Sequence, residues 1–597
     1  MSDPAWIAVI LCGLPIMSAA RSAIILRKKP TAALLITIAM LAAILLQIIC
    51  VLNPEIRGGH SHGSYIFAAG EIAFLMALGK MLEDITIKKT RRGIENLVRL
   101  SPKKALKKSG ENFEEIDAAQ IAPGDILLVM PFSTIPADGV ILKGFASINQ
   151  ANLTGESVPV EKSEGDEVLA GTVNGGTQIE IRAAKDASQT ALSKMIALVK
   201  EAEGGRAPIA RIADKWASYL VPCAVLISIF VGLFAFFVLD KEAIESATRG
   251  ATILVVFCPC ALVLATPTAI AAGIGNAARR GILIKSAEAL ETLGKCSIFA
   301  FDKTGTLTRG KVKVSKITAL SGFEKSDIAK FAAAAEAASP HPFAAAILNF
   351  AKTNSIEIPA AQNCKVLSGF GAECEVEGAK IYVGKPREGD LSFSEFRPES
   401  ASFAVVKIGG KTAGVVEFED EIKSGAKAAV LEISKSAKCV MLTGDNEKSA
   451  QKAAEEAGIA EFYANLLPAQ KLEKIRSLKG AGKICMVGDG VNDAPSLAGA
   501  DCSIAMGSLG SDAAVESAQI TVMNDNLESV SGIFALSKRA IATIKTNITL
   551  SMLVNFAAVL LAAFGVLNPV SGAVWHNLAS VLVVLNSARL LGAGKNS

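Results

Sequence analysis

Ser297-Ile-Phe-Ala-Phe-Asp-Lys-Thr-Gly-Thr-Leu-Thr308 is the stretch that decides the fold of the larger soluble part of this chain. Its apolar half predicts a buried parallel strand, and Asp302 stands where that strand ends. Two further apolar runs end in the same way: Cys439–Leu442 leads into Thr443-Gly-Asp-Asn446, and Ile484–Val487 leads into Gly488-Asp-Gly-Val-Asn-Asp-Ala-Pro495. Strands that deliver Asp, Thr and Gly at one edge predict a doubly wound α/β sheet with a phosphate and metal site.

The composition divides the 597 residues into two kinds of segment. Hydrophobic residues make up 51% and charged residues 20%, which indicates apolar membrane spans that alternate with charged globular parts. The apolar content excludes a disordered chain. A net charge of +4 is too small to indicate a nucleic-acid partner. The eleven cysteines are scattered, so we expect reduced thiols in a reducing compartment.

Runs with almost no charge predict the membrane spans, since a spanning helix needs about 20 apolar residues. They lie at 5–20, 31–52, 64–82, 216–239 and 251–278, with two more within 546–588. The first run is the weakest candidate, and the odd number of spans leaves open whether a preceding helix is absent in nature or truncated. Flanking Lys and Arg residues place the insertions at about 85–212 and 279–545 in the cytoplasm by the positive-inside rule. We expect a multi-pass protein of a prokaryotic plasma membrane.

The strand-end residues are suited to phosphoryl transfer. Asp302 can attack a phosphorus atom and form an aspartyl phosphate, while Lys303, Thr304 and Thr306 neutralise and orient the transferred group. The carboxylates of Asp489 and Asp493 are the hard oxygen ligands that Mg²⁺ prefers. Thr443 and Asp445 add contacts to phosphate and substrate. These observations predict a phosphoryl-transfer site with Mg²⁺ as its cofactor.

The three strand-end motifs together resemble the phosphorylation-domain signature of the P-type ATPases. Thr154-Gly-Glu-Ser157 resembles the actuator loop of that family, which implies that Glu156 activates the water that removes the phosphate from Asp302. The catalytic residues implied by the resemblance are Thr154, Gly155, Glu156, Asp302, Lys303, Thr304, Gly305, Thr306, Thr443, Gly444, Asp445, Lys471 and Asn492, with Asp302, Thr304, Asp489 and Asp493 at Mg²⁺.

A second set of residues resembles the nucleotide site of the heavy-metal subfamily of these pumps. Ser339-Pro-His341-Pro342 follows Glu336, and the resemblance implies that the histidine helps to bind the adenine of ATP. Gly369-Phe-Gly371 is similar to the glycine-rich nucleotide contact of that subfamily.

The resemblance implies a multi-domain membrane protein with four structural parts. These are an α-helical transmembrane bundle, a β-rich actuator domain, a haloacid dehalogenase-like α/β phosphorylation domain and an inserted α+β nucleotide-binding domain. The predicted boundaries are 1–84 for three spans, 85–212 for the actuator, 213–278 for two spans, 279–318 with 419–545 for the phosphorylation domain, 319–418 for the nucleotide-binding domain, and 546–597 for two spans.

Cys258-Pro259-Cys260 lies inside the uncharged run 251–278 and predicts the site of the transported ion. Proline frees a backbone carbonyl and locally unwinds a helix. Two thiols beside such a break can bind soft metals such as Cu⁺ and Zn²⁺ in preference to K⁺ or Ca²⁺, although buried cysteines are often only core residues. Within this family the triplet resembles the Cys-Pro-Cys of the heavy-metal pumps.

The sequence does not decide between two classes of transported metal ion. In the family, Cu⁺ pumps have a Tyr-Asn pair and a Met-Ser run in the last two spans, whereas Zn²⁺ and Cd²⁺ pumps have Lys and Asp. Here Val554 precedes Asn555, and His576 stands in the last span, where imidazole suits zinc and copper alike. A histidine there resembles the cobalt-type pumps, but those carry Ser-Pro-Cys. We lean towards a divalent metal, with Cu⁺ as the alternative.

These observations predict a metal exporter that acts as an ATP phosphohydrolase. Its partners are the lipid bilayer, ATP and a transition-metal ion, delivered by a chaperone or small thiol, and we expect a monomer. A membrane-anchored phosphatase would share the chemistry of Asp302 but would need neither the Glu156 loop nor the two cysteines. A metal sensor would have no use for Lys471. A potassium or calcium pump would require carboxylates in the fifth span.

Overall fold

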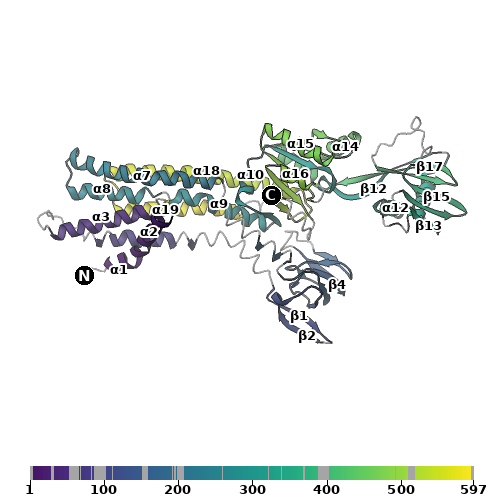
Figure 1. The fold of residues 1–597 in the computed structure, drawn as a ribbon, viewed down its shortest axis with the longest axis horizontal. Helices are drawn as coiled ribbons and strands as arrows, with labels where there is room; N and C mark the ends of the chain where they lie inside the picture. Colours follow the sequence, from purple (N-terminus) through teal and green to yellow (C-terminus); the bar gives the residue numbers. More distant parts are fainter. Residues whose placement is uncertain are drawn as a thin grey trace. The chain divides into compact units, whose positions relative to one another are not determined.

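The fold is described from a computed structural model (Figure 1). The structure describes the chain apart from residues 1–4, 28–31, 53–65, 68, 82–83, 86–101, 111, 151–158, 188, 191, 194–195, 198–207, 259, 321, 338, 340, 368–369, 387–401, 491–492, 508–517 and 593–597. The chain forms two compact units, one of Met1–Lys295 with Ile533–Ser597 and one of Cys296–Gly532.

The first unit contains the long apolar helices that were predicted as spans. Among the described residues, five helical stretches are long and apolar enough to cross a membrane, and 33–49 is a shorter apolar helix. The helices are α1 (Ala5–Ala8), η1 (Val9–Gly13), α2 (Leu14–Arg27), α3 (Ala32–Leu52), α7 (Pro208–Phe237), α8 (Ala243–Val256), α9 (Cys260–Ala278), α18 (Glu528–Ala563) and α19 (Pro569–Ala588). Residues 69–81 are also helical. Asn568 caps the N-terminus of α19 and marks the boundary between the last two helices.

The predicted break at the Cys-Pro-Cys triplet is confirmed, because α8 ends at Val256 and α9 begins at Cys260. The span predicted at 251–278 begins earlier than its uncharged run, since α8 starts at Ala243. Its charges are held in place: Arg249 pairs with Glu245 at 2.6 Å and donates a hydrogen bond to the carbonyl of Ala563. Paired charges at a helix end are tolerated in an otherwise apolar bundle. The absence of charge is therefore not a sufficient criterion for the start of α8.

Short strands form two sheets in the 104–183 segment of the first unit. One sheet has the order β2 (Asn112–Asp117), β1 (Lys104–Ser109), β3 (Ile126–Val129), β9 (Ile179–Ala183), β4 (Gly139–Lys143) and β7 (Glu167–Val168). The other has the order β6 (Val160–Lys162), β5 (Ala146–Asn149) and β8 (Val173–Asn174). Residues 169–172 separate β7 from β8, and Thr172 is buried between them.

The second unit is built around the parallel sheet that the strand-end motifs predict. Its strands follow the order β22 (Ile520–Val522), β21 (Cys502–Met506), β20 (Ile484–Gly488), β11 (Ile298–Asp302), β18 (Lys438–Leu442) and β19 (Glu461–Tyr463). Asp302 lies opposite Leu442, and Phe301 lies opposite Val487. Helices α13 (Ala426–Ser434), α14 (Glu447–Ala457), α15 (Pro468–Leu478) and α16 (Ala494–Gly499) connect the strands. The parallel register brings the three motifs to one edge of the sheet.

A second sheet interrupts this arrangement between β11 and β18. It is antiparallel, in the order β12 (Thr308–Ala319), β17 (Lys411–Ile422), β16 (Ser402–Ile408), β15 (Ala379–Gly384), β14 (Gly371–Val376) and β13 (Gln362–Leu367). Helices α11 (Lys325–Glu336) and α12 (Pro342–Thr353) pack on it around a core that contains Ile328, Ile347 and Phe418. Strands β12 and β17 extend beyond 319–418 on both sides, so paired strands connect this domain to the parallel sheet (Figure 1).

Candidate functional site

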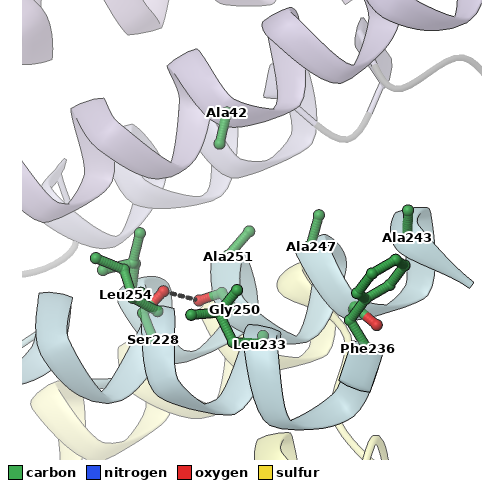
Figure 2. A pocket seen from close by; sticks show the side chains of 12 residues that line it. Ala42, Ser228, Leu233, Phe236, Ala243, Ala247, Gly250, Ala251 and Leu254 are labelled. Carbon is green, nitrogen blue, oxygen red and sulfur yellow. Dashed lines mark hydrogen bonds between the residues drawn. The ribbon is translucent and has the colours of Figure 1, made fainter. Parts of the chain in front are cut away.

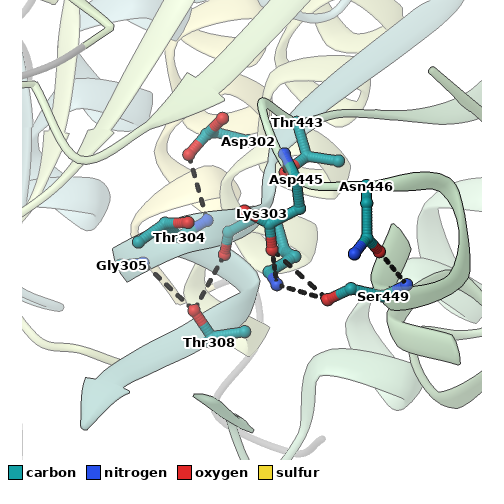
Figure 3. A network of polar contacts seen from close by, with 9 residues as sticks. All are labelled: Asp302, Lys303, Thr304, Gly305, Thr308, Thr443, Asp445, Asn446 and Ser449. Carbon is teal, nitrogen blue, oxygen red and sulfur yellow. Dashed lines mark hydrogen bonds and ion pairs between the residues drawn. The ribbon is translucent and has the colours of Figure 1, made fainter. Parts of the chain in front are cut away.

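Asp302 lies at the carboxyl end of β11, buried at the start of a tight loop (Figure 3). One carboxylate oxygen accepts a hydrogen bond from the backbone N–H of Thr304 at 3.1 Å. The loop turns at Gly305, whose φ of +72° favours glycine. Thr308 holds the loop, because its hydroxyl donates to the carbonyl of Lys303 and accepts from the N–H of Gly305. The nucleophile is thus fixed before any substrate binds.

Lys471 joins Asp302 to a second strand-end carboxylate. Its ammonium group contacts Oδ1 of Asp302 and lies 3.0 Å from Oδ1 of Asp493. All three groups are largely buried, with side-chain exposures of 12%, 6% and 2%. The structure therefore brings together Asp302, Lys471 and Asp493, which the sequence singled out from three different segments.

Burial and the neighbouring Asp493 carboxylate raise the pKa of Asp302 to about 7, against the opposing effect of Lys471. Two carboxylates in a site of low polarity cannot both ionise without further positive charge. The pKa of Lys471 is also raised, because the two carboxylates outweigh its burial. The site is therefore short of positive charge when both carboxylates are ionised.

The oxygen atoms present fit a hard divalent cation. Oδ2 of Asp493 is buried and has no hydrogen-bond partner among the described residues, which is costly unless a ligand satisfies it. Asp489 lies beside the Asp302 loop, since a Cβ atom on Gly305 would come within 3.4 Å of the Asp489 side chain. Asp302, Asp489 and Asp493 thus supply the kind of oxygen ligand that Mg²⁺ prefers, although within the described part of the chain their carboxylates do not converge on one point as a metal centre.

Lys303 points away from Asp302 into a separate polar cluster. Its ammonium group contacts Oδ2 of Asp445 and donates a hydrogen bond to the hydroxyl of Ser449 at 3.2 Å (Figure 3). Thr443 accepts a hydrogen bond from the N–H of Asp445 and shapes the turn after β18. Lys303 and Asp445 are thus paired with each other, whereas the hydroxyl of Thr306 is buried without a partner among the described residues.

Sequence reasoning missed Lys423, which supports the Asp302 loop from the end of the inserted domain. Its ammonium group is 4% exposed, donates to the carbonyl of Gly305 at 2.9 Å and pairs with Asp525 at 2.6 Å. A lysine directly after a long strand is normally solvated, so no local pattern distinguishes it. Its contacts come from residues 102 or more positions away.

Glu336 and His341 lie at the ends of the two helices that cover the inserted sheet. Glu336 is buried at the end of α11, and burial raises the pKa of its carboxyl group. One of its oxygens has no hydrogen-bond partner among the described residues. His341 is exposed and caps α12, accepting at Nδ1 from the N–H of Phe343. A buried acceptor beside an exposed imidazole can recognise a base through its amino group and its ring face.

Gly371 opens β14 with a φ of +150° and lies against the backbone of β15. A Cβ atom at this position would come within 2.1 Å of the carbonyl oxygen of Val383. Only glycine therefore fits at position 371.

In the helix bundle, the broken turn between α8 and α9 is capped by Asn555 of α18. Its side-chain N–H donates to the backbone carbonyl of Cys258 at 3.2 Å. Cys258 lies between the end of α8 and the start of α9, and its carbonyl is bound there by an amide from another helix. The Cys258 side chain is completely buried.

The expectation of reduced thiols fails at Cys258, which is disulfide-bonded in the structure. Only the thiolate form binds metal, so ligation at this residue requires reduction first. Eight cysteines are outside disulfides, as expected: Cys12, Cys223, Cys296, Cys364, Cys374, Cys439, Cys485 and Cys502.

His576 is buried in α19, and its Nδ1 has no hydrogen-bond partner among the described residues. The hydroxyls of Ser580 on the same helix and Thr266 on α9 are likewise buried without a described partner. Helix α19 packs against both α8 and α9. Within the described part of the chain, no three His, Cys, Asp or Glu side chains gather as a metal centre, so any metal site here must include other donors or the side chain of Cys260.

A cavity of about 390 Å³ lies elsewhere in the bundle, between α3, α7 and α8 (Figure 2). Its lining is mostly aliphatic, and the hydroxyl of Ser228 already donates to the carbonyl of Gly250 at 2.7 Å. An apolar cavity without converging polar groups does not bind an ion.

Some predicted site residues lie outside the described part of the chain. These are Thr154, Gly155, Glu156, Gly369 and Asn492, together with the side chains of Cys260 and Pro342.

Comparisons with known proteins identify families that match two segments of this chain. A family model for the P-type ATPase actuator domain matches residues 99–200, and one for haloacid dehalogenase-like hydrolases matches residues 296–501. The chain is 36% identical to a "Probable copper-exporting P-type ATPase" of Archaeoglobus fulgidus, over 87% of this chain and 66% of that protein. It is also 36% identical to a "Probable cadmium-transporting ATPase" of Staphylococcus aureus, over 88% of this chain and 67% of that protein.

The chain thus spans about two thirds of the length of these relatives. Among solved structures, it is similar to the crystal structure of a zinc-transporting PIB-type ATPase in the E2.Pi state. The TM-score is 0.64 at 30% identity, covering 98% of this chain and 94% of that one.

Proposed function

This chain belongs to the heavy-metal P-type ATPases, and we propose that it is an ATP-driven exporter of a transition- or heavy-metal ion. The observation that carries the proposal is the buried cluster of Asp302, Lys471 and Asp493 at the ends of parallel strands. A carboxylate that is buried, fixed and offset by a lysine is suited to attack the terminal phosphoryl group of ATP.

In the proposed mechanism, each residue of the cluster has a separate task. Asp302 is the nucleophile, and its contact with the N–H of Thr304 aims the carboxylate. Lys471 offsets the charge that accumulates when a phosphoryl group meets two carboxylates. Mg²⁺ held by Asp302, Asp489 and Asp493 would supply Lewis-acid neutralisation of the phosphoryl oxygens. The hydroxyl of Thr306, buried without a described partner, is available to the transferred group.

We assign the adenine of ATP to the inserted domain. Glu336 offers a buried acceptor and His341 an exposed ring at the neighbouring helix ends. The turn at Gly369-Phe-Gly371 would add backbone N–H donors. These contacts bind the substrate without touching the reacting phosphorus, so they belong to ground-state binding.

The transported ion is assigned to the break between α8 and α9. Cys258 and Cys260, in their thiolate forms, would be the soft ligands. Asn555 holds the backbone of the break, and His576 is a buried donor on a helix that packs against both α8 and α9. Each phosphorylation state would favour one access state, which couples ATP cleavage to movement of the metal.

For the cargo we favour a divalent metal of the Zn²⁺ or Cd²⁺ class, because the last span offers imidazole rather than methionine sulfur. Cu⁺ is the second candidate, since Asn555 is retained and a relative named as a copper exporter is as similar as one named for cadmium. The membrane-anchored phosphatase is disfavoured, because it would not require the actuator domain matched at 99–200.

The test is ATP hydrolysis by the purified chain in lipid and detergent under reducing conditions, titrated separately with Zn²⁺, Cd²⁺, Co²⁺ and Cu⁺. The variant His576→Ala is measured alongside Asn577→Ala, a neighbour on α19 that donates to the carbonyl of Leu75. Stimulation by Zn²⁺ or Cd²⁺ that is lost only in His576→Ala supports the divalent assignment. Stimulation by Cu⁺ alone would replace it with copper, and no stimulation by any metal would contradict the exporter.

A further inference from the structure

Two cysteines lie opposite each other across the β13–β14 hairpin, in the domain assigned to ATP. The strands pair at Gln362↔Glu375 and again at Lys365↔Glu373, with a register shift between these pairs. Asn363 and Cys364 together therefore lie opposite the single residue Cys374, which is the arrangement of a β-bulge. Asn363 has the positive φ, +53°, that this bulge requires. Such bulges redirect side chains, often beside functional sites.

The two thiols differ in their access to solvent. Strand β13 is the last strand of its sheet, and Cys364 is exposed on it. Cys374 is 3% exposed and packs in the core of the domain with Val376 and Ile381. The register of the hairpin nevertheless makes the two residues direct cross-strand neighbours. A reagent in solution can therefore react with Cys364, whereas the protein core shields Cys374.

The backbone geometry permits a bond between the two sulfurs. Opposite Cα atoms in antiparallel strands are about 4.5 to 5.5 Å apart, which lies within the range of about 4.4 to 6.8 Å found across disulfides. Burial, followed by the charge and the hydrogen bond of Cys364, raises the pKa of Cys374 to about 11. Cys374 therefore remains protonated, and the exposed Cys364 is the thiol that reacts first.

We propose that Cys364 and Cys374 form a reversible disulfide, a modification site that constrains the turn of the hairpin. In a reducing compartment, a protein disulfide of this kind is regulatory rather than structural. The oxidant is a low-molecular-weight disulfide such as glutathione disulfide.

The reaction is two thiol–disulfide exchanges. The Cys364 thiolate attacks one sulfur of the small disulfide, a small thiolate leaves, and a mixed disulfide forms on Cys364. The mixed disulfide carries no charge, so Cys364 no longer adds to the effect of burial on the pKa of Cys374. Cys374 loses its proton to the solvent, attacks Sγ of Cys364 and expels the second small thiol. The protein loses two electrons and two protons, and the small disulfide is reduced to two thiols.

The bond would close a ring over residues 365–373 of the sequence, which include Gly369, Phe370 and Gly371. A crosslink at this place removes conformational freedom from the turn. Since the proposed function assigns this turn to ATP, oxidation should change the KM for ATP, and this part of the inference rests on that assignment. The crosslink itself does not depend on it.

The experiment treats the purified, fully reduced chain with glutathione disulfide, traps the remaining thiols with an alkylating reagent and maps the peptides by mass spectrometry. We expect a crosslink between Cys364 and Cys374, and slower amide hydrogen exchange in the turn. In Cys374→Ser we expect a stable glutathione adduct on Cys364, and in Cys364→Ser neither product. Recovery of Cys374 as the alkylated thiol from the oxidised wild-type protein would overturn the inference.

A second group of neighbouring thiols in the same chain serves as the control for selective oxidation. Cys485 is in hydrogen-bond contact with Cys296 and Cys502, but all three side chains are at most 4% exposed. They should stay reduced under the conditions that oxidise Cys364, because a reagent cannot reach them. A KM for ATP that is unchanged in the crosslinked protein would overturn the regulatory role. Complete absence of ATP hydrolysis in the reduced protein would instead contradict the proposed function and leave the crosslink measurable.

Discussion

At the scale of single residues, the protonation of Asp302 determines whether a cation can bind beside it. Its pKa of about 7 is raised by burial and by Asp493. A proton on Asp302 removes the charge that would attract Mg²⁺. Below pH 7 the apparent affinity for Mg²⁺ should therefore fall, by about tenfold for each pH unit. Above this pH it should level off.

This pH dependence can be measured by calorimetric titration of Mg²⁺ into the nucleotide-free chain between pH 5.5 and 8.5. In Asp493→Asn the carboxylate that helps to raise the pKa of Asp302 is removed. The point at which affinity begins to fall should then move to lower pH, even though overall affinity is weaker. A Mg²⁺ affinity that does not vary with pH would contradict the proposed arrangement.

A second residue-scale prediction concerns the nucleophile itself. Asp302→Asn keeps the shape of the side chain and its acceptor for the N–H of Thr304, but an amide cannot form an acyl phosphate. We expect no acid-stable phosphate label from radioactive ATP and an unchanged thermal unfolding midpoint. Asp445→Asn, which leaves Lys303 without its charge partner, should only reduce the label. Normal labelling of Asp302→Asn would disprove the assignment.

At the scale of elements, Lys423 connects the end of β17 to the Asp302 loop. Lys423→Met preserves the length of the side chain but leaves the buried carbonyl of Gly305 without its donor at 2.9 Å, a loss of about 1–3 kcal/mol. The loop should become less well fixed, so kcat should fall by about tenfold while the KM for ATP changes little. Steady-state kinetics test this, with the exposed Lys435→Met as the control. A change in KM alone would contradict the positioning role.

Asn555 makes a similar connection inside the helix bundle. Asn555→Ala removes the hydrogen bond to the carbonyl of Cys258, so the break between α8 and α9 loses its cap. We expect metal-stimulated hydrolysis to fall by about tenfold or more, since metal sites depend on groups that orient their ligands. Labelling from inorganic phosphate, which does not need the metal site, should persist. Loss of both activities would indicate a general folding defect instead.

The elements that the sequence predicted well are those governed by local patterns. The parallel strands ending at Asp302, Thr443 and Gly488 follow from apolar runs and turn residues, and the helix break follows from a single proline. The contacts of Lys423 could not be predicted, because its partners lie 102 or more residues away and involve a backbone carbonyl. The bulge at Asn363 was missed for a similar reason: only pairing with β14 reveals the extra residue.

At the scale of the whole molecule, the proposed cycle requires two opposite reactions at one aspartate. Asp302 belongs to the second unit and Glu156 to the sequence of the first, and the cycle assigns them the successive steps of forming and hydrolysing the phosphate. Separate residues for the two steps allow each to be coupled to a different access state of the bundle. A defect in Glu156 should therefore arrest the cycle after phosphorylation rather than before it.

Glu156→Gln keeps the size of this side chain and removes its ability to accept a proton from water. Labelling from ATP should proceed at the wild-type rate, whereas decay of the label after a chase with unlabelled ATP should slow by about 10²-fold or more, a typical contribution of a general base. The matched control is Glu164→Gln, an exposed residue in the same soluble segment, which should decay normally. If Glu156→Gln instead prevented labelling, Glu156 would be acting before phosphoryl transfer, and the order of steps in the proposed cycle would be wrong.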